Sequence, residues 1–223
     1  MLNDKRIRVI IGHYGSGKTE FAVNYAMKLA EHKKVALADL DVVNPYFRSR
    51  ERSEILEAKG VKVIGSALGA TINMDLPSIS AGVLEPLQNE DFDLIMDVGG
   101  DSVGARVLAR YKKYFIEGDY DMFCVVNTNR PETMDVQGII KHVRAIEDVV
   151  GVSVTGLINN THLLRDTSRD DVLEGQEIIV SASRELNIPI KYISTLEEVV
   201  SELPEGLEGE LFPIKMYMRD PWM

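Results

Sequence analysis

The sequence near the start of the chain reads Gly12-His13-Tyr14-Gly15-Ser16-Gly17-Lys18-Thr19, directly after the apolar run Val9-Ile10-Ile11. Glycines let the backbone curl so that successive N–H groups point into one concavity, and a following helix adds the positive end of its dipole. The lysine supplies a charge for β- and γ-phosphates, and the next hydroxyl can bind Mg²⁺. The spacing Gly-x-x-x-x-Gly-Lys-Thr, placed between a strand and a helix, therefore predicts a P-loop that binds a nucleoside triphosphate.

The rest of the chain alternates short apolar runs with longer amphipathic stretches. The apolar runs predict strands over residues 8–11, 35–41, 61–64, 92–98, 122–126, 154–158 and 190–193. The stretches between them predict helices over residues 19–31, 53–58, 79–87, 102–115, 135–149 and 171–186. This alternation predicts an α/β fold, a P-loop NTPase with a mostly parallel twisted sheet of about seven strands and helices on both faces. We expect a nucleotide-binding domain over residues 1–203 and a C-terminal arm over residues 204–223.

The composition excludes several classes of protein. The chain has 223 residues and a formal net charge of −10, which argues against a protein that coats nucleic acid or anionic membrane. It has no apolar run near the ~20 residues of a membrane span, so we expect a cytoplasmic protein without a nucleic-acid partner. Cys124 is the single cysteine and lies in an apolar run, which predicts a buried strand residue and allows no internal disulfide.

Polar side chains follow the predicted strands at the points where they end. In a parallel sheet these ends meet at one edge, which is where ligands bind. Asp97 ends an apolar strand and is placed to hold Mg²⁺ with Thr19. Asp41 lies nearer the end of its strand than Asp39, so we expect Asp41 to face the phosphates and Asp39 to lie on the other side of the sheet. Asp101 is a candidate for orienting the attacking water, or alternatively the N-cap of the next helix.

Four segments together resemble one family of P-loop proteins. They are the P-loop, the Asp39-Leu40-Asp41 strand end, the segment Asp97-Val98-Gly99-Gly100-Asp101 and the segment Gly156-Leu157-Ile158-Asn159-Asn160. In this order they resemble the MinD/ParA/Mrp group of deviant Walker A ATPases, which includes the CobQ/CobB nucleotide-binding domains and is related to the nitrogenase iron protein. The resemblance implies ATP and Mg²⁺ as cofactors.

The same resemblance implies roles for individual residues. The catalytic residues would be Lys18, Asp41 and Asp101, and the Mg²⁺ site would use Thr19, Asp41 and Asp97. Asn160 would read the adenine edge. The nucleotide-binding set would comprise Gly12, His13, Tyr14, Gly15, Ser16, Gly17, Lys18, Thr19, Glu20 and Asn160.

The sequence departs from that family at two points. The family carries a signature lysine directly after the first P-loop glycine, which crosses a nucleotide-sandwiched homodimer to reach the partner's phosphates. Here that position is His13, which is shorter and only partly charged near neutral pH, so a homodimer is an open expectation. With one cysteine, the chain has no Cys-x-x-Cys pair for an iron–sulfur cluster.

Three functions remain open from the sequence. The first is a switch that hydrolyses ATP slowly and controls an unknown protein partner. The second is a small-molecule kinase or ligase similar to dethiobiotin synthetase, acting on a small acid. The third is a nucleotide-binding regulatory module without turnover. The segment Asn159-Asn160-Thr161-His162 lacks the acid of the Asn-Lys-x-Asp guanine signature, which favours adenine over guanine.

Overall fold

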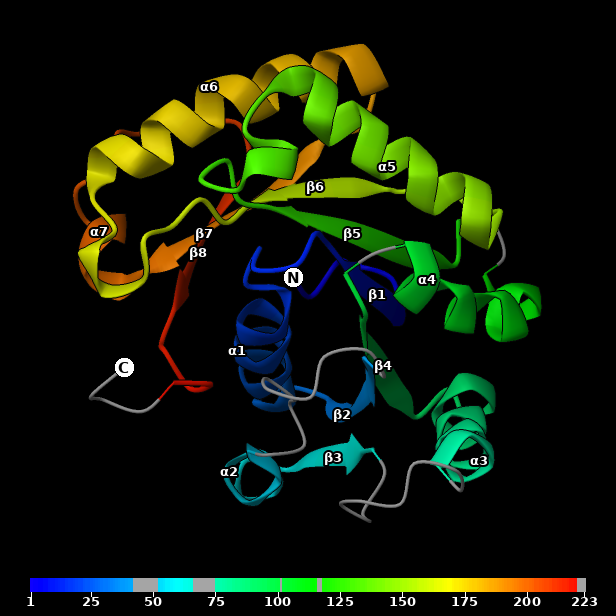
Figure 1. Cartoon of the computed structure of the whole chain (residues 1–223). Helices are drawn as coiled ribbons and strands as arrows, with labels where there is room; N and C mark the ends of the chain where they lie inside the picture. The colour runs from blue at the N-terminus through cyan, green and yellow to red at the C-terminus, as the bar shows by residue number, and fades with distance from the viewer. Residues whose placement is uncertain (42–51, 66–74, 101, 116–117, 220–223) are drawn as a thin grey trace.

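A computed structural model describes residues 1–41, 52–65, 75–100, 102–115 and 118–219 of the chain (Figure 1). Within these residues, eight strands form one sheet in the order β3-β2-β4-β1-β5-β6-β7-β8, and every neighbouring pair is parallel. The strands are β1 (Ile7–Ile11), β2 (Lys34–Leu40), β3 (Val61–Ile64), β4 (Phe92–Val98), β5 (Tyr120–Val126), β6 (Gly156–Asn159), β7 (Ile190–Leu196) and β8 (Glu210–Ile214). The predicted α/β fold with a parallel sheet is confirmed.

Helices connect successive strands and cover the sheet. The α-helices are α1 (Lys18–Ala30), α2 (Ser53–Ala58), α3 (Asp75–Gln88), α4 (Ser102–Ala105), α5 (Val136–Val150), α6 (Arg169–Leu186) and α7 (Glu197–Val200). The helix expected over residues 102–115 is instead the short α4 followed by a 3-10 helix, Arg106–Tyr114. None of the helices among the described residues has the length and apolar character needed to cross a membrane.

The two faces of the sheet carry separate apolar cores. On β2, Val35 and Leu37 pack with α1, whereas Ala36, Ala38 and Leu40 pack in the core shared with α5 and α6. Figure 1 shows α5 and α6 side by side over one face and α1 on the other. Because both faces are covered, the central strands carry apolar residues on both faces rather than in strict alternation with polar ones.

The connection from β1 to α1 lies near the middle of the sheet, at the carboxyl ends of the strands. β1 pairs with β4 on one side and β5 on the other, so the P-loop emerges between the carboxyl ends of two neighbouring strands. β8, which the sequence did not predict, lies at the edge of the sheet beside β7. It falls within residues 204–223, the segment expected to be an arm, and it places the following residues beside α1.

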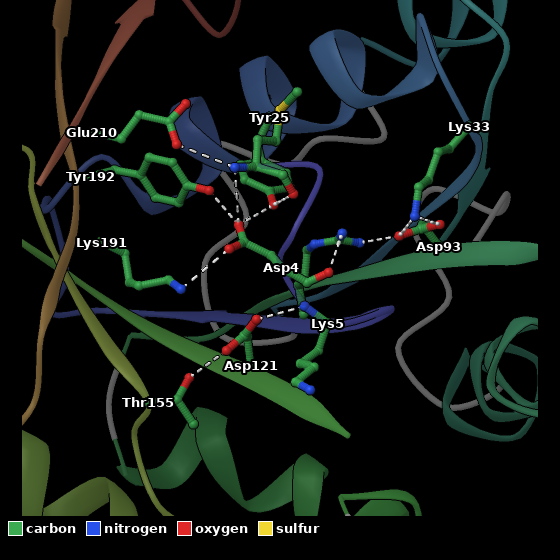
Figure 2. A network of polar contacts seen from close by, with 12 residues as sticks. Asp4, Lys5, Tyr25, Lys33, Asp93, Asp121, Thr155, Lys191, Tyr192 and Glu210 are labelled. Carbon is green, nitrogen blue, oxygen red and sulfur yellow. Dashed lines mark hydrogen bonds and ion pairs between the residues drawn. The ribbon is translucent and has the colours of Figure 1, made fainter. Parts of the chain in front are cut away.

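A polar network lies at the amino ends of the strands, on the side of the sheet opposite the P-loop (Figure 2). The carboxylate of Asp4 accepts hydrogen bonds from the hydroxyls of Tyr25, at 2.7 Å, and Tyr192, and it pairs with Lys191 at 3.3 Å. Burial alone would raise the pKa of Asp4, but the two hydroxyls, the N-terminal ammonium group and the Lys191 charge together outweigh it, and the pKa lies below its usual value. The network therefore joins the segment before β1 to α1 and β7.

Asp4→Asn is expected to cost about 1–3 kcal/mol of stability at pH 7, because it removes an ionised acceptor from buried partners. Since the folded pKa lies below the ordinary value of 3.8, this stability is present above that value and is lost as the pH falls through the folded pKa. Urea denaturation at pH 7 and pH 3 should therefore show a gap between wild type and variant that narrows in acid. The exposed Asp170→Asn is the matched control, and an equal loss in both variants would contradict the assignment.

Candidate functional site

The P-loop backbone adopts a conformation that needs its glycines. Gly17 is the N-cap of α1 and has φ +81°, in the left-handed region that other residues rarely adopt. A Cβ at Gly17 would clash with the side-chain amide of Asn160. Gly100, after β4, approaches the loop so closely that an added Cβ would lie 2.9 Å from the nitrogen of Tyr14. The loop is thus held between the ends of β4 and β6.

Three carboxylates and one lysine lie together beneath the loop. The Nζ of Lys18 is 3.7 Å from Oδ2 of Asp41, and both side chains are buried. Asp39 accepts a hydrogen bond at 3.2 Å from the backbone nitrogen of Asp41. The expectation that Asp39 lies on the other side of the sheet is wrong, because residues two apart on a strand share a face. The negative charge of Asp39 raises the pKa of Asp97, which is its neighbour on β4 in the sheet register.

Asp97 is the most perturbed of these groups. Burial, with smaller contributions from Asp39 and Asp41, raises its pKa to about 7, and Lys18 partly offsets the rise. Neither oxygen has a hydrogen-bond partner among the described residues. A fully buried carboxylate without a partner is costly unless a cation satisfies it. Because Thr19 also favours its charged form, Asp97 and Thr19 fit the hard oxygen ligands that Mg²⁺ prefers.

Asp97→Asn is expected to stabilise the Mg²⁺-free protein at pH 8, by on the order of 2 kcal/mol. The folded pKa is raised from 3.8 to about 7, so between these values the folded state keeps a proton that the unfolded state has released. Wild-type stability therefore falls as the pH rises through this window, and the amide removes that dependence. Thermal denaturation from pH 5 to pH 8 in EDTA checks this; a variant less stable than wild type at pH 8 would contradict it.

A second group of polar side chains holds the loop from the β5 and β6 side. The amide nitrogen of Asn160 donates to the carbonyl oxygen of Ser16 at 2.7 Å, and Nε of Arg130 donates to that of Gly15 at 3.0 Å. Asn127 links the ends of the two strands, since its Oδ1 accepts the backbone N–H of His162 at 3.3 Å. These contacts attach the P-loop to the segments that follow β5 and β6.

Two atoms of this group have no hydrogen-bond partner in the described part of the chain. They are Oδ1 of Asn160 and Nε2 of His162, and both are buried. Nδ1 of His162 accepts the backbone N–H of Leu164 at 3.3 Å, so Nε2 carries the proton. Burial, with the charges of Arg130 and Arg219, lowers the pKa of His162 to about 4, so the ring is neutral at pH 7. The site therefore contains one buried acceptor and one buried donor whose hydrogen bonds are not satisfied by the described residues.

A cavity of about 330 Å³ opens beside these two side chains. Its polar end is formed by the P-loop and the first turn of α1, and its apolar end by residues from the ends of β7 and β8 and beyond. The lining includes Gly17, Lys18, Thr19, Asn160, His162, Thr195, Ile214 and Met216. A cavity that joins a phosphate-binding loop to an apolar slot, with Asn160 and His162 in its lining, suits a nucleoside.

His13 lies at the other end of the loop, away from this cavity. Its Nδ1 is 3.6 Å from a carboxylate oxygen of Glu132, and its ring packs edge-on against His142 with centroids 5.5 Å apart. Tyr14, next to it, is largely exposed. His13 is thus directed away from the cavity, whereas Tyr14 is among the residues that line it.

The structure brings most of the predicted site residues together. Lys18, Thr19, Asp41 and Asp97 form one group, and Asn160 lies on the opposite side of the P-loop. Asp101 lies outside the described residues, as do residues 42–51, which follow Asp41. The sequence did not single out Arg130 or the residues after β8. Arg130 belongs to a polar run directly after β5, and this position could have marked it as a site residue. No sequence pattern predicts that Met216 lines the same cavity as Lys18.

No family model and no curated protein matches the sequence. Solved structures do match. FtsY from Thermotoga maritima is 23% identical with a TM-score of 0.58, covering 87% of this chain and 63% of that one. Chloroplast FtsY from Physcomitrella patens is 20% identical with a TM-score of 0.58, covering 92% and 61%. The chain has the fold of the P-loop NTPases.

A third solved structure in this group contains a nucleotide. It is the signal recognition particle receptor FtsY from Elizabethkingia anophelis in complex with GDP, which is 20% identical with a TM-score of 0.55 and covers 84% of this chain. This chain spans 56–63% of the length of these three proteins. At such identities the likeness establishes the shared fold alone. The function of this chain depends on its own site residues.

Proposed function

We propose that the protein binds Mg²⁺-ATP and hydrolyses it slowly, as a nucleotide-controlled switch for a partner protein. The observation that carries the proposal is the grouping of Lys18, Asp41 and the fully buried Asp97 beneath a complete P-loop. Three buried carboxylates beside one lysine leave an excess of negative charge. Such a group is costly when it is buried, and a divalent cation that binds there compensates its charge.

The phosphate end of the site would be held by the chain's own donors. The N–H groups of the loop, the start of α1 and Lys18 would bind the β- and γ-phosphate oxygens. Thr19 and Asp97 would hold Mg²⁺, which would neutralise charge on those oxygens. Asp41, 3.7 Å from the lysine nitrogen, would orient the attacking water and accept its proton.

The base end of the site favours adenine. With a small rotation of the two side chains, the amine of adenine would donate to Oδ1 of Asn160, and an adjacent ring nitrogen would accept from Nε2 of His162. Guanine also offers a neighbouring donor and acceptor, but its 2-amino group would need a further acceptor. The carboxylate of Glu20, the acid in the cavity wall, already accepts N–H bonds from Tyr217 and Met218. The GDP bound to the Elizabethkingia protein makes guanine the alternative to test.

The MinD/ParA-like resemblance supports a switch in preference to a simple hydrolase. In such switches the γ-phosphate orders loops beside the site, and a partner distinguishes the two states. The resemblance also leaves open the second function, transfer of the phosphoryl group to a small acid. Both functions use the same phosphate end, so they differ in what receives the phosphoryl group.

The test measures nucleotide binding and phosphate release by the purified protein with Mg²⁺-ATP and Mg²⁺-GTP. We expect tighter binding of ATP and slow, Mg²⁺-dependent release of phosphate. Tighter binding of GTP would overturn the adenine assignment and leave the P-loop function standing. Binding of ATP without release would move the proposal to phosphoryl transfer, which a screen of small carboxylic acids would then examine.

A further inference from the structure

The five residues that follow β8 are hydrogen-bonded to side chains of α1. We call these residues, 215–219, the strap. Asn24 of α1 and Lys215 form a reciprocal pair, with the backbone nitrogen of Lys215 donating to Oδ1 and Nδ2 donating to the carbonyl oxygen, both at 2.8 Å. One turn earlier, Glu20 accepts the N–H of Tyr217 at 2.6 Å and that of Met218 at 3.1 Å. The strap therefore takes its hydrogen bonds from side chains of α1, without being a strand or helix itself.

The same residues form a wall of the cavity beside the P-loop. Met216, Met218 and Arg219 line it together with Lys18 and Thr19. Met218 is also buried in the core that α1 shares with β8. Thioether side chains are polarisable and adapt to flat aromatic surfaces, which suits contact with a nucleobase. The strap thus bonds to α1 on one side and borders the cavity on the other.

Glu20 connects the strap to the P-loop. It follows Thr19 directly and lies in the first turn of α1. Burial raises its pKa, and the N–H groups of Tyr217 and Met218 partly offset that rise. A largely buried carboxylate needs such donors, and the strap supplies them. The position of the strap is consequently fixed by the helix turn that also carries the phosphate-binding residues.

We propose that the strap is the wall that holds the nucleobase and that Glu20 is the positioning residue that docks it. This inference rests on the proposed function, since it assigns a role at the base end of the same site. Losing the strap should weaken binding of the base and leave binding of the phosphates unchanged. Glu20 would then set how much tighter a nucleotide binds than its phosphate chain alone.

The experiment compares Mg²⁺-ATP with inorganic tripolyphosphate by calorimetry, in wild type and in Glu20→Gln. The amide keeps the size of the side chain but loses one acceptor, which leaves one strap N–H facing a donor. We expect ATP affinity to fall about tenfold while tripolyphosphate affinity changes less than about twofold. Glu31→Gln, at the far end of α1 and exposed, is the matched control and should change neither.

A second variant and a second measurement keep the inference testable if Glu20→Gln folds poorly. Asn24→Asp removes the donor to Lys215 and should produce the same split between the two ligands. The strap contains Lys215 and Arg219, so trypsin cleavage there measures its release; ATP should slow cleavage more than tripolyphosphate does. Unchanged ATP affinity, or an equal loss for both ligands, would overturn the inference. Wild-type protein that binds neither ligand would instead overturn the proposed function.

Discussion

Lys18→Ala is expected to weaken the binding of Mg²⁺-ATP at least about 100-fold. A charge-assisted contact to phosphate contributes roughly 1.5–3 kcal/mol, and the loss here includes a second effect. Without the lysine, the buried carboxylates Asp39, Asp41 and Asp97 would face the triphosphate with no protein cation among them. Their repulsion adds to the lost contact. Calorimetric titration of the variant with Mg²⁺-ATP measures the change.

The control for this variant is a lysine outside the site. Lys34 is mostly exposed and pairs with Asp91 at 4.0 Å, so Lys34→Ala should bind ATP like the wild type. Thermal denaturation of Lys18→Ala tells lost binding from lost folding, because only the first leaves a cooperative transition. Micromolar ATP affinity in a folded Lys18→Ala variant would show that the loop does not bind phosphate as proposed.

Asp41→Ala is expected to lower the rate of phosphate release at least about 100-fold while ATP binding stays within about fivefold of wild type. A positioned general base contributes typically 10²–10⁴-fold to a rate, and Asp41 is the carboxylate that pairs with Lys18. It also lies at the end of its strand, where an added Cβ on Gly99 would come within 3.2 Å of its Oδ1. Single-turnover phosphate release with saturating enzyme separates this step from binding.

Asp39 provides the matched comparison, since it is an equally buried carboxylate on the same face of β2. Asp39→Asn keeps the oxygen that accepts the N–H of Asp41, so the variant should retain most of the turnover. If the two substitutions slowed release equally, the water would not be positioned by Asp41 in particular. A large effect confined to Asp39 would transfer the role to that residue.

The fold was largely predictable because its signals are local. The runs that became β3 and β4 were predicted with the observed bounds, 61–64 and 92–98, because most of their residues are apolar, although β3 includes Lys62 and β4 includes Asp93 and Asp97. β8 was not predicted, because its apolar run is short and interrupted. Its sequence Glu210-Leu211-Phe212-Pro213-Ile214 contains a proline and a charged residue. Proline is tolerated on an edge strand, and only the position beside β7 makes this segment a strand.

The phosphate end of the site was predictable and the base end only in part. A P-loop is a contiguous segment, and Asp41 and Asp97 each end an apolar run, so chain order sufficed. Asn160 was named from the family resemblance, and the structure places it against Ser16. The strap depends on a contact between Glu20 and Tyr217, 197 residues apart, for which no local pattern exists. Such contacts follow from the sheet order rather than from spacing.

That separation has a consequence for how the protein is made. The P-loop is synthesised about two hundred residues before the strap that borders the same cavity. A nascent chain that ends before residue 215 can pair β1 with β4 and β5 but still lacks one side of its cavity. If the strap holds the base as proposed, a nascent chain would retain a nucleoside only after residue 219 has been synthesised.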